Sequence, residues 1–338
     1  MKGMLTPSQQ VMEFFMAHNI EFIDGKAAMA YAGKVPWHGL GVSVPADLTP
    51  EQMLDAANLN WTVEKKTCFI YNSDTEQFES SDITALVRSS DNKVLTHVGT
   101  DWNPMNNIDA FRFFNEYVMA GDMEMNTAGS LQNGKIVWAL AKVKDSFVVK
   151  TPQGDDIIDS YLLFTNPHKY GQSIDVRFTP IRVECNNMLT MALGQKTSSM
   201  VKVNHKNKFD EEKVKETLGI AHHYMQDYGN LASFLASRNY TKDSLKEYFK
   251  SVFPKTTKNA MEHESSRNAE LASNLVETQP GAEFAKGTWW QAYNAVTFMT
   301  DHIVGRNADT RLSSAWYGEN QRRKLDALNM AKQFATAA

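Results

Sequence analysis

Apolar and polar residues alternate through the middle of the chain, and this alternation predicts β-strands between Trp61 and about His205. The first two runs are rich in β-branched residues, and Asp91-Asn92 predicts a hairpin turn within the second. Asn133-Gly134 is the strongest short-range hairpin signal in the chain. The runs with strand patterns are 61–71, 83–99, 127–143, 161–168, 173–184 and 198–205.

Helical spacing of apolar residues interrupts the strands once and then continues to the C-terminus. Asn106-Asn107 predicts the start of a helix from Ile108 to Met119. Thr49 and Gln52 form a capping-box pattern that predicts a helix to about Asn58 within an otherwise loop-rich N-terminal segment. Beyond Phe209, helices are expected at 210–236, 241–251, 259–276, 287–304 and 311–336.

This order of elements predicts an α+β fold with an antiparallel β-sheet core, interspersed helices and an all-helical C-terminal part. We divide the chain into a loop-rich N-terminal segment (1–60), a β-rich central core (61–208) and a helical C-terminal region (209–338).

The run from Thr179 to Gly194 reads as a strand that leads directly into a short helix. Ile181 alternates with Arg182 in a strand pattern, and Asn186 or Asn187 then supplies an N-cap for a helix that starts at Met188. The asparagine pair either caps this helix or contacts a ligand at the corner, and the sequence leaves both open.

Composition places the chain among ordinary soluble globular proteins. Its 338 residues are 42% hydrophobic and 22% charged, with a net charge of -4. No apolar run approaches the ~18 to 20 residues that span a bilayer, and the N-terminus does not resemble a signal peptide. The expected location is the cytoplasm, with no membrane partner, and Cys68 and Cys185 are expected to be reduced thiols.

Several kinds of chemistry are excluded because the sequence motifs that they require are absent. The chain has no phosphate-binding glycine loop, and the run that begins His263-Glu264 has Arg267 where a zinc protease needs its second histidine. We therefore expect no cofactor, no metal and no catalytic residues. Cys185 with His205 could form a thiol and its base, but a buried structural cysteine is the commoner outcome at the end of a strand. Trp37 and His38, between Pro36 and Gly39, are either a candidate loop contact to a ligand or a plug that closes the core.

The middle of the chain is its only basic part, with a net charge of about +5 between Ser130 and Lys208 against about -9 before it. If these cations share one face they would bind phosphates, whereas a solvated sheet face explains them equally well. The basic residues are Lys135, Lys142, Lys144, Lys150, Lys169, Arg177, Arg182, Lys196, Lys202, Lys206 and Lys208. The aromatic residues available for base stacking are Trp138, Phe164, Tyr170 and Phe178.

Taken together, five motifs resemble the phage/plasmid-like proteins grouped as domain of unknown function 932. They are PWHGLG (36–41), TPIRVECNNMLTMAL (179–193), VKVNHKNKFDEEKVKETLG (201–219), GTWWQAYNAVTFMTDH (287–302) and RLSSAWYG (311–318). The resemblance implies a protein encoded by a phage, prophage or plasmid. Its order of elements is similar to that of phage single-strand annealing proteins, which bind DNA as oligomeric rings or filaments.

The leading hypothesis is therefore an oligomeric, non-enzymatic protein of the host cytoplasm that binds single-stranded DNA in annealing, recombination or replication. Its expected DNA contacts are Arg177, Arg182, Asn186, Asn187, Lys196, Lys202, His205 and Lys206. One alternative is a phage interaction or structural protein that binds no nucleic acid. Another is an enzyme of unrecognised type built around Trp37, His38, Cys185 and the asparagine pair.

Overall fold

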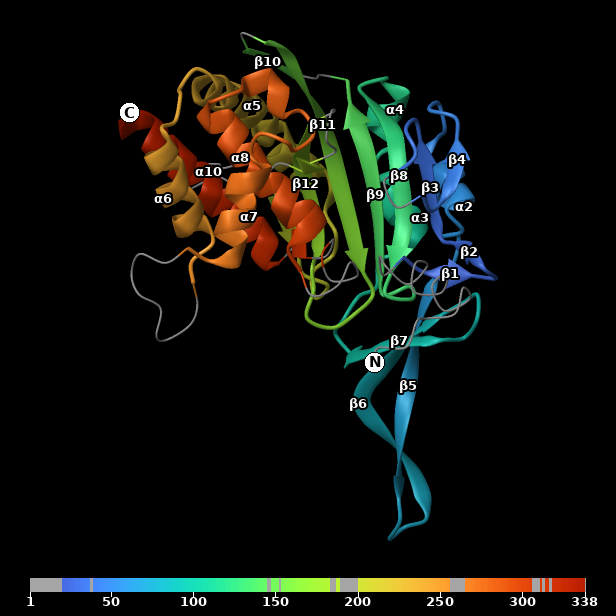
Figure 1. Ribbon diagram of the computed structural model, residues 1–338. Coiled ribbons are helices and arrows are strands. Elements are labelled where there is room, and N and C mark those ends of the chain that lie inside the picture. Colours follow the sequence, from blue (N-terminus) through green and yellow to red (C-terminus); the bar gives the residue numbers. More distant parts are fainter. Residues whose placement is uncertain are drawn as a thin grey trace.

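A sheet of nine strands forms the centre of the molecule, and a bundle of helices packs beside one of its edges (Figure 1). The computed structural model describes residues 20–36, 39–144, 147–151, 153–182, 187–188, 200–255, 265–305, 311, 314–315 and 318–337. The predicted α+β class, with an antiparallel sheet and a helical C-terminal part, is confirmed.

The strands of this sheet follow the order β13-β12-β11-β9-β8-β3-β4, with β10 also paired to β11 and β14 to β12. All these pairs are antiparallel except β3 with β4, which is parallel. The strands are β3 (Met29–Ala32), β4 (Val42–Val44), β8 (Met123–Leu131), β9 (Ile136–Val143), β10 (Phe147–Thr151), β11 (Gly154–Pro167), β12 (Ile174–Arg182), β13 (Asn187–Met188) and β14 (Met200–Val203). Two of them, β3 and β4, come from the first sixty residues, where the sequence indicated loops.

The predicted helix start after Asn187 is wrong. Asn187 and Met188 form β13, which pairs with Arg182 and Ile181 of β12. The chain therefore folds back on its own strand, and the strand ladder takes the place of the first turn of a helix. Asn186 and Lys196 lie outside the described residues.

Most predicted helices are present, and side-chain caps mark where several of them begin. The single helix expected over 108–119 is divided into two, and Asn106 makes no side-chain cap hydrogen bond at its start. Thr49 and Gln52 form the expected capping box, and the side chain of Asp210 accepts a hydrogen bond from the backbone of Lys213. The α-helices are α2 (Pro50–Ala56), α3 (Asn107–Arg112), α4 (Asn115–Met119), α5 (Glu211–Ala236), α6 (Lys242–Val252), α7 (Arg267–Leu275), α8 (Trp289–Phe298) and α10 (Glu319–Ala337). A 3-10 helix, η1 (Ala282–Ala285), and a π-helix, η2 (Met299–Ile303), flank α8. Among the described residues, no helix combines the length and the apolar character needed to cross a membrane.

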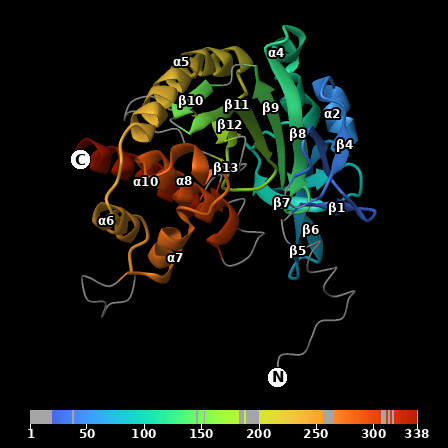
Figure 2. The ribbon, with the colours of Figure 1, turned by 45° about the horizontal axis from the view of Figure 1, so that its top comes forward.

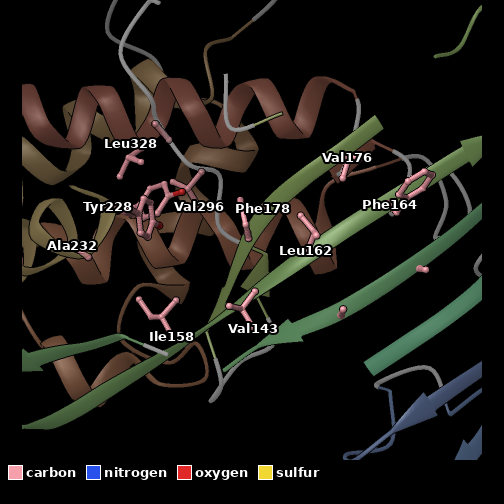
Figure 3. Close-up of a cluster of buried hydrophobic side chains, with 14 of the residues drawn as sticks. Val143, Ile158, Leu162, Phe164, Val176, Phe178, Tyr228, Ala232, Val296 and Leu328 are labelled. Atoms are coloured by element: carbon pink, nitrogen blue, oxygen red, sulfur yellow. The ribbon is translucent and has the colours of Figure 1, made fainter. Parts of the chain in front are cut away.

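One face of the sheet carries the main hydrophobic core. Phe178 of β12 lies beside Tyr228 of α5 and Val296 of α8, so the sheet and the bundle share one apolar interior (Figure 3). Burial of this kind stabilises a fold by ~25 cal/mol per Å² of apolar surface. The opposite face has a smaller core around Trp138.

A long hairpin projects from the end of the molecule, away from the helical bundle (Figure 1). Its strands are β5 (Val63–Asn72) and β6 (Gln77–Arg88), and β7 (Val94–Gly99) pairs with the base of β6. A separate two-stranded ribbon, β1 (Phe22–Ile23) and β2 (Lys26–Ala27), lies near this base. We call the hairpin formed by residues 63–88 the arm.

A buried ion pair anchors the base of the arm. The Arg88 guanidinium contacts Glu21 at 2.5 Å and Asp91 at 2.6 Å, and it lies 5.3 Å from the centre of the Trp61 ring. The hydroxyl of Ser130 donates to the second Glu21 oxygen at 2.7 Å. Arg88 therefore joins the arm to Glu21, the residue just before β1, and Glu21 in turn joins it to Ser130 of β8.

Candidate nucleic-acid interface

Three loops meet at the end of the sheet nearest the arm: the β8–β9 turn, the β11–β12 loop and the loop after β14. The backbone N–H of His168 donates to the carbonyl of Lys135 at 2.8 Å, which joins the first loop to the second. The N–H of Asn103 donates to the carbonyl of His205 at 2.8 Å, which joins the segment before α3 to the third. Segments far apart in the sequence thus form one surface.

The interior of this end is built on a neutral histidine, His168. Asn107 donates its amide N–H groups to the carbonyls of Leu59 and Trp61, so its Oδ1 is left to accept from His168 Nε2 at 2.8 Å. Burial, with smaller contributions from His205 and Arg88, lowers the pKa of His168 to about 3. The ring is therefore uncharged at neutral pH.

His205, expected to contact DNA, is part of the same interior. Its ring stacks on Trp102 with the centroids 3.8 Å apart, and its Nδ1 lies 3.1 Å from the carbonyl of Asn103. Burial lowers the pKa of His205, against the opposing effect of the Asn103 and Pro167 carbonyls. A buried, neutral ring cannot reach a phosphate, so we assign His205 a structural role.

Two lysines lie above this interior without a carboxylate partner. Lys169 donates from Nζ to the side-chain oxygen of Gln132 at 2.8 Å, and within the described part of the chain neither Lys169 nor Lys135 forms an ion pair. Partial burial lowers the pKa of Lys169, and the nearby charge of Lys135 lowers it further. Like charges brought together without compensation favour the binding of an anion.

An exposed aromatic ring stands beside these lysines. Tyr170 is 74% exposed, and it lies close enough to Lys206 to affect the pKa of that lysine. Lys206 contacts Asp101 at 2.7 Å, which raises the pKa of Lys206 and lowers that of Asp101. We call Lys135, Lys169, Tyr170 and Lys206 the basic loop end.

The other residues expected to contact DNA lie away from the basic loop end or outside the described residues. Arg177 is buried and forms a two-bond ion pair with Asp175, at 2.6 and 2.7 Å, so its guanidinium is engaged inside the sheet. Lys202 is exposed on β14, opposite Asp175 in the strand register. Arg182 and Asn187 are described as backbone only, and Trp37, His38 and Cys185 lie outside the described residues, as do Asn186 and Lys196. Of the ten expected site residues, Lys206 alone belongs to the basic loop end.

The basic residues of the middle segment do not form a single stripe. Lys142 pairs with Asp159 at 2.7 Å on the sheet, and Lys144 lies beside Gly121, at the opposite end of the strands from the basic loop end. Of the four aromatic residues considered for stacking, Trp138, Phe164 and Phe178 are buried and Tyr170 is exposed. The signal that could have placed Lys135 and Lys169 together is the Asn133-Gly134 turn, which puts Lys135 at the same sheet end as the β11–β12 loop.

The described residues contain no group of three His, Cys, Asp or Glu side chains placed to hold a metal ion.

A family model described as a domain of unknown function, DUF932, matches residues 94–326. The chain belongs to the DUF932 family. All of the basic loop end lies within the DUF932 match, whereas both strands of the arm precede it. Neither the curated proteins nor the solved structures contain a match to the chain.

Proposed function

We propose that this protein binds single-stranded DNA through the basic loop end, and that it acts as an oligomer in phage or plasmid annealing, recombination or replication. The observation that carries the proposal is that two like-charged lysines, Lys135 and Lys169, lie close together beside the exposed ring of Tyr170. Uncompensated lysines attract phosphates, and an exposed ring offers a surface on which a base can stack. This is the usual combination in proteins that bind single strands without strong sequence preference.

The test is fluorescence anisotropy of the purified protein with labelled single-stranded and duplex DNA across a salt series. We expect preference for the single strand and an affinity that falls as salt rises, because bound lysines release counterions from the strand. Replacing Lys135 and Lys169 with alanine should reduce the slope of log K against log salt by roughly 0.7 for each lysine removed. Lys246→Ala, an exposed lysine of α6, is the matched control and should leave the slope unchanged.

Two substitutions separate the ring of Tyr170 from its hydroxyl. Tyr170→Ser removes the stacking surface and should weaken binding by ~1 to 3 kcal/mol, whereas Tyr170→Phe keeps the ring and should bind like the parent protein. Equal binding by all of these variants, or no binding at low salt, would exclude the basic loop end as the DNA site.

Binding to another protein is a second candidate function, and it is favoured by the arm rather than by the basic loop end. The outer part of the arm exposes three aromatic side chains, which is unusual for a surface without a partner.

A further inference from the structure

The outer part of the arm presents an aromatic face to solvent. Tyr71 lies opposite Phe78 in the strand register, with ring centroids 5.3 Å apart, and Phe69 lies on the same face two residues before Tyr71. Their exposed fractions are 60% for Phe69, 55% for Tyr71 and 72% for Phe78. Exposed aromatic residues grouped in this way are typical of contact sites between proteins.

The charge around this face is negative. Residues 69–83 contain no lysine or arginine, and their acidic residues are Asp74, Glu76, Glu79 and Asp82. Glu79 is opposite Ile70 in the register and lies on the other face of the hairpin, whereas Asp74 and Glu76 lie in the turn at its tip. Such a surface repels nucleic acid and favours a partner that is both apolar and basic.

The helical bundle of the same chain contains a pocket with these properties. Its volume is about 430 Å³, and it lies where the ends of α6 and α7 meet α10. Pro254 gives it an exposed apolar part. Phe253 is only 2% exposed and lies beneath Arg323, whose guanidinium is 5.5 Å from the centre of the ring and pairs with Glu319 of α10. The residues that line it are Phe253, Pro254, Lys255, Ser266, Arg267, Asn268 and Arg323, and we call it the basic pocket.

We propose that the arm of one copy of this chain inserts its aromatic face into the basic pocket of a second copy. The aromatic rings match the exposed Pro254 surface, and the acidic residues of the arm match the exposed cations Lys255 and Arg267. Both views place the arm well away from its own bundle (Figures 1 and 2), so the contact joins two different copies. Arm and pocket are different surfaces, and the assembly is therefore head-to-tail, as a closed ring or an open filament.

The first test measures the mass of the full-length protein by light scattering during gel filtration, without nucleic acid. We expect masses above the 38.1 kDa of a single chain and a loss of assembly as salt rises. Phe78→Ser in the arm and Arg267→Glu at the pocket should each raise the apparent dissociation constant by roughly tenfold or more. Both side chains are exposed, so circular dichroism should show an intact fold.

The second test mixes these two variants in equal amounts. Phe78→Ser keeps a working pocket, Arg267→Glu keeps a working arm, and a head-to-tail contact therefore allows one productive interface between them. The mixture should form dimers and no larger species. Met119→Ser, at an exposed methionine of α4, and Lys246→Glu, on α6, are the matched controls and should assemble like the parent protein.

A parent protein that stays monomeric at high concentration and low salt would overturn the proposal. Assembly that survives Arg267→Glu and is lost only in Phe78→Ser would also overturn it, because that result indicates arm-to-arm pairing. Since no nucleic acid is present, these outcomes are independent of DNA binding.

Discussion

At the scale of single residues, His168 shows how hydrogen bonding fixes a charge state. Asn107 uses both amide hydrogens on backbone carbonyls, so the histidine must donate from Nε2 and leave Nδ1 as an acceptor. Nδ1 is buried and has no hydrogen-bond partner in the described structure. Protonation would add an N–H there without an acceptor, close to His205 and Arg88, which is why the neutral ring is favoured.

This arrangement predicts a loss of stability in acid. The pKa of His168 is about 3 in the folded protein, against an ordinary value of 6.5, so between these values the unfolded chain binds more protons. The free energy of unfolding should therefore fall as the pH drops below ~6.5, by at most ~1.4 kcal/mol per pH unit from this group. Denaturant unfolding at several pH values measures the slope.

His168→Gln should remove this group's part of the slope, because an amide can donate to Asn107 but does not titrate. His97→Gln, at an exposed histidine of β7, is the control and should retain the parent slope. A parent protein equally stable at pH 4.5 and pH 7.5 would contradict the assignment.

At the scale of elements, the sequence pattern correctly predicted the turns and helix starts that depend only on residues close together in the chain. The Asn133-Gly134 hairpin, the Thr49 capping box and the starts of α5 and α6 needed no information from distant residues. Strands β3 and β4 are short and gain their stability by pairing within the sheet, so their sequence alone gave no strand pattern. For the same reason Asn187 became part of β13: its partner is β12, and that pairing outweighs the local signal for a helix cap.

The β8–β9 turn gives a prediction at this scale. Gly134 has a φ of +86°, and a Cβ there would lie 2.6 Å from an Arg88 nitrogen that Glu21 already holds. Gly171 has a φ of +84° with open space around it, so the two glycines differ mainly in this clash. Gly171→Ala should cost about 1 to 2 kcal/mol from backbone strain alone. Gly134→Ala should cost a further ~1 to 3 kcal/mol, because Arg88 must move from a buried ion pair. If denaturant unfolding shows that Gly134→Ala and Gly171→Ala lower the free energy of unfolding equally, the Arg88 side chain moves aside at no cost.

At the scale of the whole molecule, the surfaces proposed for DNA and for self-association are separate. Lys135, Lys169 and Lys206 are distant in sequence and come together only because their loops share one end of the sheet. The sequence could indicate a basic middle segment, but it could not tell which cations pair internally, as Arg177 does with Asp175. The arm and the basic pocket, in turn, would place copies of the basic loop end in a row or ring.

A repeated array of weak sites predicts avidity for long strands. Subunits joined through the arm would hold neighbouring basic loop ends at high effective concentration, so a long strand gains affinity without any new contact. Phe78→Ser should bind an oligonucleotide of about 8 nucleotides as the parent protein does, since one site spans roughly 4 to 16 nucleotides. On a strand of about 60 nucleotides the same variant should bind at least tenfold more weakly than the parent. Lys169→Ala, by contrast, should weaken binding to both lengths, because it removes a phosphate contact from every site. If Phe78→Ser and the parent protein bind the long strand equally, self-association contributes nothing to DNA binding.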